Sequence, residues 1–141
     1  MSTRKLIRVE DVMKREFDLV DGLATVAEAL KSMRHVNSRV LVVNKRHPDD
    51  EYGIVMLSDI AKKVLARDRS PARVNVYEVM SKPVLSVDPK MDIRYCARLF
   101  DRFGLSRAPV IDAGNVVGIV SYTDMVVRGM LKEWLEEHGE Q

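Results

Sequence analysis

The stretch that decides the fold is GIVSYTD at residues 118–124, which repeats the earlier GIVMLSD at residues 53–59. Each copy runs from a glycine through the β-branched pair Ile-Val and two further residues to Ser or Thr and then Asp. An apolar β-branched run predicts a strand, and a hydroxyl residue followed by an acid predicts the first turn of a helix. Both stretches therefore predict a strand that leads directly into a helix.

Other segments are duplicated in the same order, which indicates two copies of one unit. VEDVM at residues 9–13 matches VYEVM at residues 76–80, and SRVLVVN at residues 38–44 matches SRAPVID at residues 106–112. The copies differ in the loop before the repeated phrase, which reads KRHPDDE in the first and AGN in the second. In the short loop, Gly114-Asn115 predicts a tight hairpin turn with positive φ.

Periodicity within each copy predicts a β-α-β-β-α unit. Apolar residues spaced i, i+3, i+4, i+7 predict one amphipathic helix in each copy; they are Val26, Ala29, Leu30 and Met33, then Ile93, Cys96, Ala97 and Phe100. Strands are expected at 39–44, 52–56, 108–112 and 115–120, and second helices at 59–66 and 124–137, with Ser58 and Thr123 as their N-caps. The predicted boundaries are 8–68 and 75–133 for the repeats, 69–74 for a linker and 134–141 for a C-terminal helix end and tail. Because one small unit buries little surface, the two sheets are expected to pair and share a core.

Composition indicates a folded globular protein, with 46% hydrophobic and 31% charged residues. No apolar run is long enough to span a bilayer, and the N-terminus lacks a signal-peptide pattern, so we expect a soluble cytoplasmic protein. The single cysteine, Cys96, allows no internal disulfide and is expected to be a buried, inert thiol. The net charge is only +2. The basic stretch at residues 67–73 mixes signs, so we expect a solvated linker and no nucleic-acid partner.

No pattern of catalytic or metal-binding residues is present. His35, His47 and His138 lie far apart and lack cysteine or serine partners at useful spacing. Neither a phosphate-binding loop nor a dinucleotide-binding fingerprint occurs. The acidic loop at residues 49–51 is expected to be a solvated hairpin tip. The sequence therefore predicts a non-enzyme without a metal or catalytic cofactor.

The duplicated unit, with its Val-Met segments and its Gly-apolar-apolar-x-x-(Ser/Thr)-Asp ends, resembles the cystathionine-beta-synthase (CBS) domain pair, or Bateman module. The resemblance covers about residues 8 to 132. It implies an α/β (α+β) fold of tandem repeats packed sheet to sheet with pseudo-two-fold symmetry. It also implies a regulatory module that binds adenosine nucleotides in clefts between its repeats and commonly forms a homodimer.

The resemblance also implies roles for particular residues. Asp124 would bind the ribose hydroxyls, Ser121 the phosphate or ribose, and Arg107 the phosphate, with the strand before Pro109 beside the base. The chemistry agrees, since a helix N-terminus suits phosphate and a first-turn carboxylate can accept hydrogen bonds from ribose. The remaining candidate nucleotide-binding residues are Thr123, Gly118, Ala108, Pro83, Val84 and Ser86, and in the first copy Asp59, Ser58 and Arg39.

Structural roles stay open beside these assignments. A first-turn acid stabilises a helix without any ligand. The arginines could pair with carboxylates, Ser121 could be an ordinary strand residue, and Gly118 could serve strand packing instead of close approach to a ligand. In the first copy Met56 occupies the position of Ser121, so the Asp124 site is expected to be the stronger one.

Two functions remain under consideration. In the first, a stand-alone regulatory module for energy sensing binds AMP, ADP, ATP or a related adenosyl ligand such as S-adenosylmethionine or NAD, and signals to a separate effector protein. In the second, the chain is a constitutive dimerising adaptor without bound nucleotide. The adaptor is suggested by an apolar stripe near the C-terminus, although Trp134 could instead fold back on its own core. The stripe consists of Val127, Met130, Leu131, Trp134 and Leu135.

Overall fold

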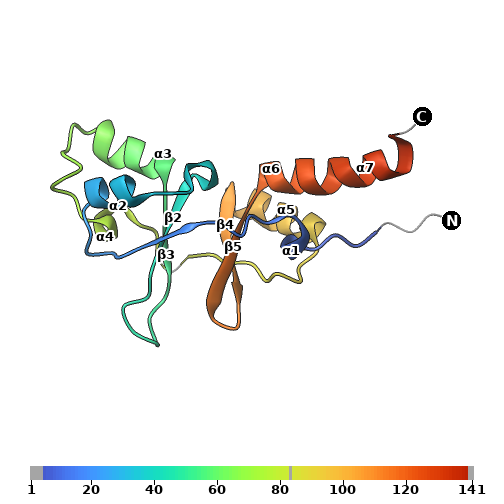
Figure 1. The fold of residues 1–141 in the computed structure, drawn as a ribbon, viewed down its shortest axis with the longest axis horizontal. Helices are drawn as coiled ribbons and strands as arrows, with labels where there is room; N and C mark the ends of the chain where they lie inside the picture. The colour runs from blue at the N-terminus through green and yellow to red at the C-terminus, as the bar shows by residue number, and fades with distance from the viewer. Residues whose placement is uncertain (1–4, 83, 140–141) are drawn as a thin grey trace. The chain divides into compact units, whose positions relative to one another are not determined.

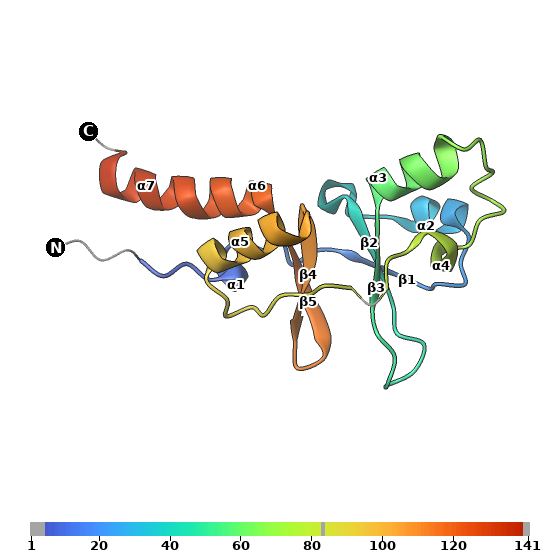
Figure 2. The ribbon, with the colours of Figure 1, turned by 180° about the vertical axis from the view of Figure 1, so that it is seen from behind.

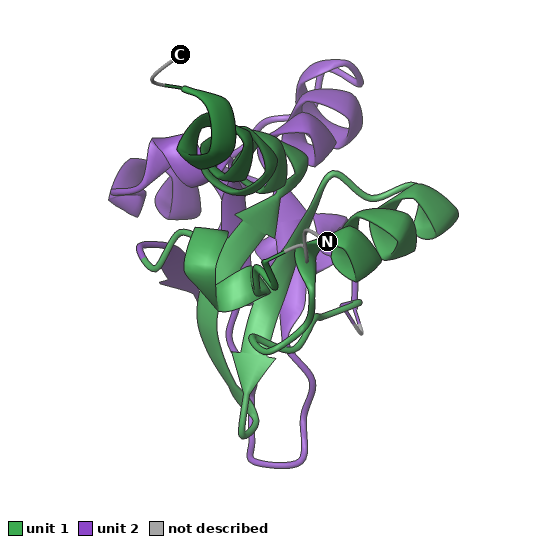
Figure 3. Ribbon diagram, turned by 90° about the vertical axis from the view of Figure 1, so that its right-hand side faces the viewer, with its two compact units in different colours: residues 1–15, 85–141 green, residues 16–84 purple. Residues whose placement is uncertain are grey.

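The computed structural model describes residues 5–82 and 84–139. The chain divides into two compact units, unit 1 with residues 1–15 and 85–141 and unit 2 with residues 16–84 (Figure 3). Each unit combines a small sheet with helices and has a hydrophobic cluster of its own. The fold is therefore of the α+β type. Among the described residues, no helix has the length and apolar character that crossing a bilayer requires.

Unit 2 contains a three-stranded sheet in the order β1-β2-β3 (Figure 1). Strand β1 (Asp18–Val20) is parallel to β2 (Val40–Val43), and β2 is antiparallel to β3 (Gly53–Met56). All four β2 side chains are buried, as expected for a central strand of β-branched and leucine residues. Leu41 and Val43 belong to the cluster that forms the core of this unit.

The helices of unit 2 are short, and local hydrogen bonds define their ends. Helix α2 (Val26–Ser32) begins at Thr25, whose side chain accepts a hydrogen bond from the Glu28 N–H at 3.1 Å, while the Glu28 carboxylate accepts one from the Thr25 N–H. The other helical segments are η1 (Val36–Ser38), α3 (Leu57–Ile60) continuing into the π-helical η2 (Ala61–Leu65), and α4 (Val76–Val79).

Unit 1 is built on an antiparallel hairpin of β4 (Arg107–Asp112) and β5 (Asn115–Ser121). Val87 adds a single parallel bridge to Val110 where unit 2 has a full third strand. The other segments are α1 (Val9–Val12), α5 (Ile93–Phe103) and a continuous helical run of α6 (Tyr122–Asp124), η3 (Met125–Met130) and α7 (Leu131–His138). This run lies alongside α5 in both ribbon views (Figures 1 and 2).

The Val-Met segment of each sequence copy packs in the unit that holds the rest of the other copy. Helix α1 contributes Val9 and Val12 to the core of unit 1, whereas α4 contributes Val76 and Val79 to the core of unit 2. Backbone bridges fix both segments, Lys14 to Ile119 and Ser81 to Ile54. The compact units are thus not identical with the two sequence copies. The predicted pairing of the two sheets stays a prediction.

The predicted amphipathic helices and the four strands are confirmed within one or two residues. The predicted N-caps are wrong, because each strand ends two residues earlier than Ser58 and Thr123. The structure starts α3 after Met56 and α6 after Ser121, and Ser121 is the capping side chain. The predicted hairpin turn is displaced by one residue. Ala113 and Gly114 have φ of 51° and 81°, and Asn115 is already the first residue of β5.

Candidate functional site

The carboxylate of Asp124 is the central feature of the candidate site. Asp124 is the third residue of the helical run and is only 4% exposed. Ser121, at the end of β5, accepts a hydrogen bond from the Asp124 N–H at 3.2 Å and donates one to Asp124 Oδ2 at 3.0 Å. The strand-to-helix junction therefore fixes this carboxylate and uses one of its two oxygens.

The second oxygen, Oδ1, faces a cation at longer range. Arg128 Nη1 lies 4.0 Å from Asp124 Oδ1 and also donates a hydrogen bond to the Met13 carbonyl at 3.3 Å. Oδ1 can accept hydrogen bonds from the hydroxyls of a ligand, and the guanidinium of Arg128 adds positive charge beside it. Sequence reasoning missed Arg128, although its i, i+4 spacing from Asp124 is a recognisable signal for an acid–base pair on a helix.

Unit 1 brings several other predicted residues close to Ser121. Arg107, at the start of β4, is the cross-strand neighbour of Ser121, and the next two residues, Ala108 and Pro109, are buried in β4. Ser86 immediately precedes Val87, whose N–H donates to the Pro109 carbonyl at 3.1 Å. Hydroxyl, carboxylate and guanidinium groups thus come from consecutive parts of one hairpin and the helix that follows it. Thr123, in contrast, is exposed on the helix.

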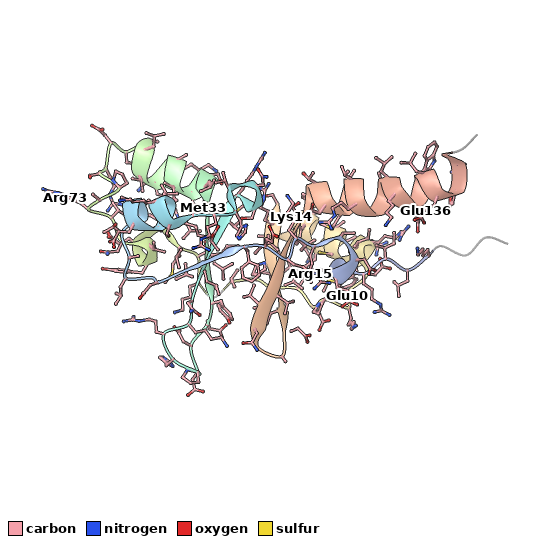
Figure 4. All side chains as sticks on the ribbon, viewed as in Figure 1. Glu10, Lys14, Arg15, Met33, Arg73 and Glu136 are labelled. Carbon is pink, nitrogen blue, oxygen red and sulfur yellow. The ribbon has the colours of Figure 1, made fainter. Side chains whose placement is uncertain are left out.

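Gly118 has a packing role that the sequence analysis left as an alternative. A Cβ at this position would lie 2.7 Å from Met13 Sδ and 2.8 Å from the Lys14 carbonyl oxygen. Lys14, labelled in Figure 4, is bridged to the neighbouring Ile119 by two backbone hydrogen bonds of 2.9 Å. The space that a side chain at Gly118 would occupy is therefore filled by the chain itself, which supports the packing role, and a role of Gly118 beside a ligand stays a prediction.

The corresponding residues of the first copy lie in unit 2 and differ in geometry. Asp59 is half-buried, and its Oδ2 accepts a hydrogen bond from the Met56 N–H at 3.0 Å. Ser58 is exposed. Arg39 adopts the left-handed conformation, with φ of 60°, unlike Arg107, which is part of a strand. The equivalence of the two arginines therefore does not extend to their backbones.

Two of the predicted residues that would complete the base pocket fall near the boundary of the units. Val84 is the last residue of unit 2 and is half-buried. Pro83 lies outside the described residues. The predicted participation of both residues, and of both repeats in one cleft, stays a prediction.

Cys96 has the properties of a core residue. Its side chain is fully buried in the cluster of unit 1, and this burial raises the pKa of the thiol to about 11. The thiol is therefore protonated at neutral pH and is a poor nucleophile. Within residues 5–82 and 84–139, no group of three or more His, Cys, Asp and Glu side chains is arranged to hold a metal ion.

The C-terminal apolar stripe is exposed. Trp134 is 54% exposed and stacks on His138 with ring centroids 4.8 Å apart, so the alternative in which it folds back on its own core is wrong. Beside the stripe, a groove of about 460 Å³ lies between α5 and the helical run. Arg94 donates to Glu133 Oε1 across this groove at 2.7 Å. No local sequence signal could have predicted this pair, because its members are far apart in the chain.

Comparisons with known proteins agree with this architecture. A family model described as CBS domain matches residues 9–66 and again residues 76–129. The chain is 31% identical over 129 residues to the CBS domain-containing protein YhcV of Bacillus subtilis, covering 89% of this chain and 87% of that protein. An uncharacterized protein of Methanopyrus kandleri is 30% identical over 124 residues, and the match covers 85% of this chain but only 61% of that protein.

Solved structures show the same fold. A hexameric CBS-CP12 protein from bloom-forming cyanobacteria is 38% identical, with a TM-score of 0.85, over 91% of this chain and 74% of that one. The CBS domain pair of protein MJ0100, solved in complex with 5′-methylthioadenosine and S-adenosyl-L-methionine, has a TM-score of 0.75 over 91% of this chain and 99% of that one, at 24% identity. From the two family-model matches and these likenesses, we conclude that the chain belongs to the CBS-domain family.

Proposed function

We propose that the chain is a regulatory module that binds an adenosine nucleotide or related adenosyl ligand at the Asp124 site and passes its occupancy to a separate effector protein. The observation that carries this proposal is the carboxylate of Asp124, which is fixed by Ser121 through one oxygen. The other oxygen remains placed to accept hydrogen bonds from the two hydroxyls of a ribose. A buried, pre-oriented acceptor of this kind favours a hydroxyl-bearing ligand.

The surroundings of Asp124 favour a ligand that also carries negatively charged groups such as phosphate. The helical run starts one residue after Ser121, and its N-terminal end has the partial positive charge that favours phosphate. Arg107 is placed across the hairpin from Ser121 and Arg128 lies near Asp124 Oδ1. AMP, ADP and ATP satisfy both features. S-adenosylmethionine, methylthioadenosine and NAD share the adenosine part and belong in the same test.

Signalling requires that the ligand favour one conformation over another. A ligand shifts a population only by as much as its affinity differs between the two conformations. In this proposal the effector recognises the ligand-favoured conformation, and the chain contributes no reaction chemistry. Because the chain spans 61% of the length of the Methanopyrus kandleri relative, any activity of such longer proteins lies outside this proposal.

Thermal unfolding and calorimetry with a panel of adenosyl compounds test the proposal. A ligand present at about 100 times its Kd stabilises the native state by about 2.7 kcal/mol and raises Tm by several degrees. Asp124→Asn keeps the shape of the side chain and removes the charged acceptor, so it should abolish the Tm rise for the ligand that binds. Asp59→Asn is the matched control in the first copy.

The outcomes separate clearly. Loss of the Tm rise in Asp124→Asn with its retention in Asp59→Asn supports the Asp124 site. An unchanged response in Asp124→Asn would refute this assignment. The absence of any Tm shift and any heat across the panel, together with no adenosyl compound in mass spectra of the purified protein, would refute adenosyl binding itself.

A second candidate function, the constitutive dimerising adaptor, is favoured by the exposed apolar stripe on η3 and α7. Apolar side chains exposed in a contiguous row on a helix are typical of an interface. Sedimentation of the wild type and Trp134→Ala, each with and without nucleotide, distinguishes this function. For an adaptor, the sedimenting mass falls from dimer toward monomer in Trp134→Ala, and nucleotide changes the mass of neither protein.

A further inference from the structure

The longer loop of the first copy, residues 45–51, takes no part in the candidate site. It connects β2 to β3 and lies at the end of the unit 2 sheet opposite to α3 (Figures 1 and 2). A crevice of about 360 Å³ opens at this end of the sheet. Two short segments line the crevice: Leu19, Val20, Asp21 and Leu23 from one, and Asn44, Lys45 and Arg46 from the other.

The crevice has a topological cause. Strands β1 and β2 are parallel neighbours, so their carboxyl ends, Val20 and Val43, lie side by side. The segments that line the crevice are the ones that contain or follow these two ends. In open sheets, ligands commonly bind outside the carboxyl ends of parallel strands. The volume of about 360 Å³ is also within the range of small-molecule pockets.

Asp21 brings a negative charge to the crevice. Its Oδ1 accepts a hydrogen bond from the Leu23 N–H at 2.9 Å, and the residue is exposed. Asp88 forms the same kind of turn in unit 1, where its Oδ1 accepts a hydrogen bond from the Lys90 N–H at 2.7 Å. The turn therefore uses one oxygen of each acid. The other oxygen of Asp21, Oδ2, can accept hydrogen bonds from a ligand.

Arg46 brings a positive charge that the second copy lacks. Its backbone N–H donates to Asp50 Oδ2 at 2.9 Å, and Lys82 Nζ donates to the same oxygen at 2.8 Å, so the backbone at residue 46 is held in place. The guanidinium itself forms no ion pair within the described part of the chain. After the matching strand of the second copy come Ala113 and Gly114, which carry no charge.

The two charges of the crevice do not neutralise each other. Asp21 and Arg46 line the same crevice, yet they are not paired with each other in residues 5–82. The remaining charged residue of the lining, Lys45, has its ammonium over the Tyr52 ring, 4.9 Å from the ring centroid. A ligand with a cationic and an anionic group close together can satisfy both Asp21 and Arg46, whereas a simple anion or cation satisfies only one of them.

The lining also offers apolar surface and a hydrogen-bond donor. Leu19 and Leu23 are 51% and 60% exposed, so an apolar ligand group could cover them. Asn44 Oδ1 accepts a hydrogen bond from the Lys45 N–H at 2.9 Å, which leaves the Asn44 Nδ2 group to donate to a ligand. Apolar side chains beside a few polar groups are typical of small-molecule sites.

We propose that this crevice of unit 2 binds a free α-amino acid with an aliphatic side chain. The α-carboxylate pairs with the guanidinium of Arg46, which can donate two parallel hydrogen bonds to it. The α-ammonium donates to Asp21 Oδ2, and the aliphatic side chain covers Leu19 and Leu23. The proposal goes beyond nucleotide binding at Asp124 and does not depend on it.

Isothermal titration calorimetry of the full chain tests the proposal with L-leucine and L-methionine as probes. We expect a Kd below about 1 mM for both amino acids. L-Leucinamide lacks the carboxylate, and 4-methylpentanoate lacks the ammonium. Each of these two compounds should bind at least about tenfold more weakly than L-leucine, because each leaves one charged side chain of the crevice without a partner.

Two variants remove the charges without disturbing the backbone. Asp21→Asn keeps the Oδ1 that accepts the Leu23 N–H, and Arg46→Gln keeps the backbone N–H that binds Asp50. Each should weaken L-leucine binding at least about tenfold. Asp88→Asn in the equivalent turn of unit 1 and Arg67→Gln at an exposed arginine of unit 2 are the matched controls and should bind L-leucine like the wild type. Circular dichroism shows whether each variant is folded.

Loss of binding in both crevice variants, with retention in both controls, supports the proposal. The absence of heat with either amino acid at about 10 mM would overturn it. Binding of 4-methylpentanoate as tight as that of L-leucine, or an equal loss in Asp88→Asn and Asp21→Asn, would overturn it as well. The response to adenosyl compounds should be the same in Arg46→Gln and the wild type, so the two proposals can fail separately.

Discussion

Substitution of Gly118 by alanine tests whether the repeated phrase is maintained by packing. The new Cβ would lie 2.7 Å from Met13 Sδ, 2.8 Å from the Lys14 carbonyl oxygen and 3.0 Å from Met13 Cγ. The first two distances are shorter than real Cβ contacts, so a neighbour must move. The Met13 side chain can rotate, but the Lys14 carbonyl accepts a hydrogen bond from the Ile119 N–H at 2.9 Å and is held in place.

Overpacking of this kind costs about 1–3 kcal/mol. Replacing glycine by alanine in an ordinary extended backbone returns about 0.4–1 kcal/mol through the unfolded state. We therefore expect Gly118→Ala to lower the free energy of unfolding by about 1–2 kcal/mol. Gly53→Ala is the matched control in the other copy. Its closest neighbour is the flexible Met80 Sδ at 2.9 Å, and the backbone oxygen of Ser81 lies at 3.3 Å, so its cost should be smaller.

Urea unfolding followed by circular dichroism and by tryptophan fluorescence measures both costs. Trp134 is the only tryptophan of the chain and belongs to unit 1, so its emission reports on the unit that contains Gly118. Adding Met13→Ala to Gly118→Ala should recover only part of the loss, because the Lys14 carbonyl contact remains. A Gly118→Ala variant as stable as the wild type, or less affected than Gly53→Ala, would contradict the argument.

Two further predictions concern loops. Ala113→Asn should raise the free energy of unfolding by about 0.5–1 kcal/mol in urea titrations, because φ of 51° at residue 113 and 81° at Gly114 suits an Asn-Gly turn; an unchanged or lower stability would contradict this. In the hairpin loop of unit 2, the hydrogen bonds from the Lys82 ammonium and the Arg46 N–H lower the pKa of Asp50 below its ordinary value of 3.8. A lowered folded-state pKa stabilises the fold above the unfolded pKa, and this stabilisation is lost as the pH falls through the lower folded-state value. The stability difference between wild type and Asp50→Asn should therefore stay constant above about pH 5 and shrink progressively as the pH falls below about 4, whereas Asp49→Asn, an exposed neighbour, should show little difference at any pH.

The elements that could be predicted from the sequence are those with local causes. The amphipathic helix beginning at Ile93 follows from apolar spacing, and Asp92 supplies its N-cap through a hydrogen bond to the Arg94 N–H at 2.9 Å. The sequence prediction placed the starts of α3 and α6 too late, because both Ser58 and Thr123 have the residue type of a helix N-cap. Ser121, and not Thr123, is the N-cap of α6. Ser121 lies three residues before Asp124 and still has extended backbone, so its hydroxyl can accept a hydrogen bond from the Asp124 N–H.

The exchange of segments between the copies could not be predicted in this way. The Met13 and Met80 segments are alike, and so are the Gly118 and Gly53 phrases, so the pattern permits packing within a copy as readily as across copies. Only the three-dimensional path of the chain, in which α1 joins β5 and α4 joins β3, selects the exchanged arrangement. The Arg94–Glu133 ion pair could not be predicted from the sequence for the same reason, because its two residues are far apart in the chain.

The same exchange bears on how the candidate site should be understood. The glycine of each repeated phrase serves the packing of a Val-Met segment, so the phrase would be retained even in a chain without a ligand. What differs between the copies is the residue that holds the acid. Asp124 is held by the side chain of Ser121, whereas Asp59 is held by the backbone N–H of Met56. The hydroxyl at position 121 is not needed to start a helix, because the first copy starts one with methionine, and this difference makes Asp124 the stronger candidate for ligand binding.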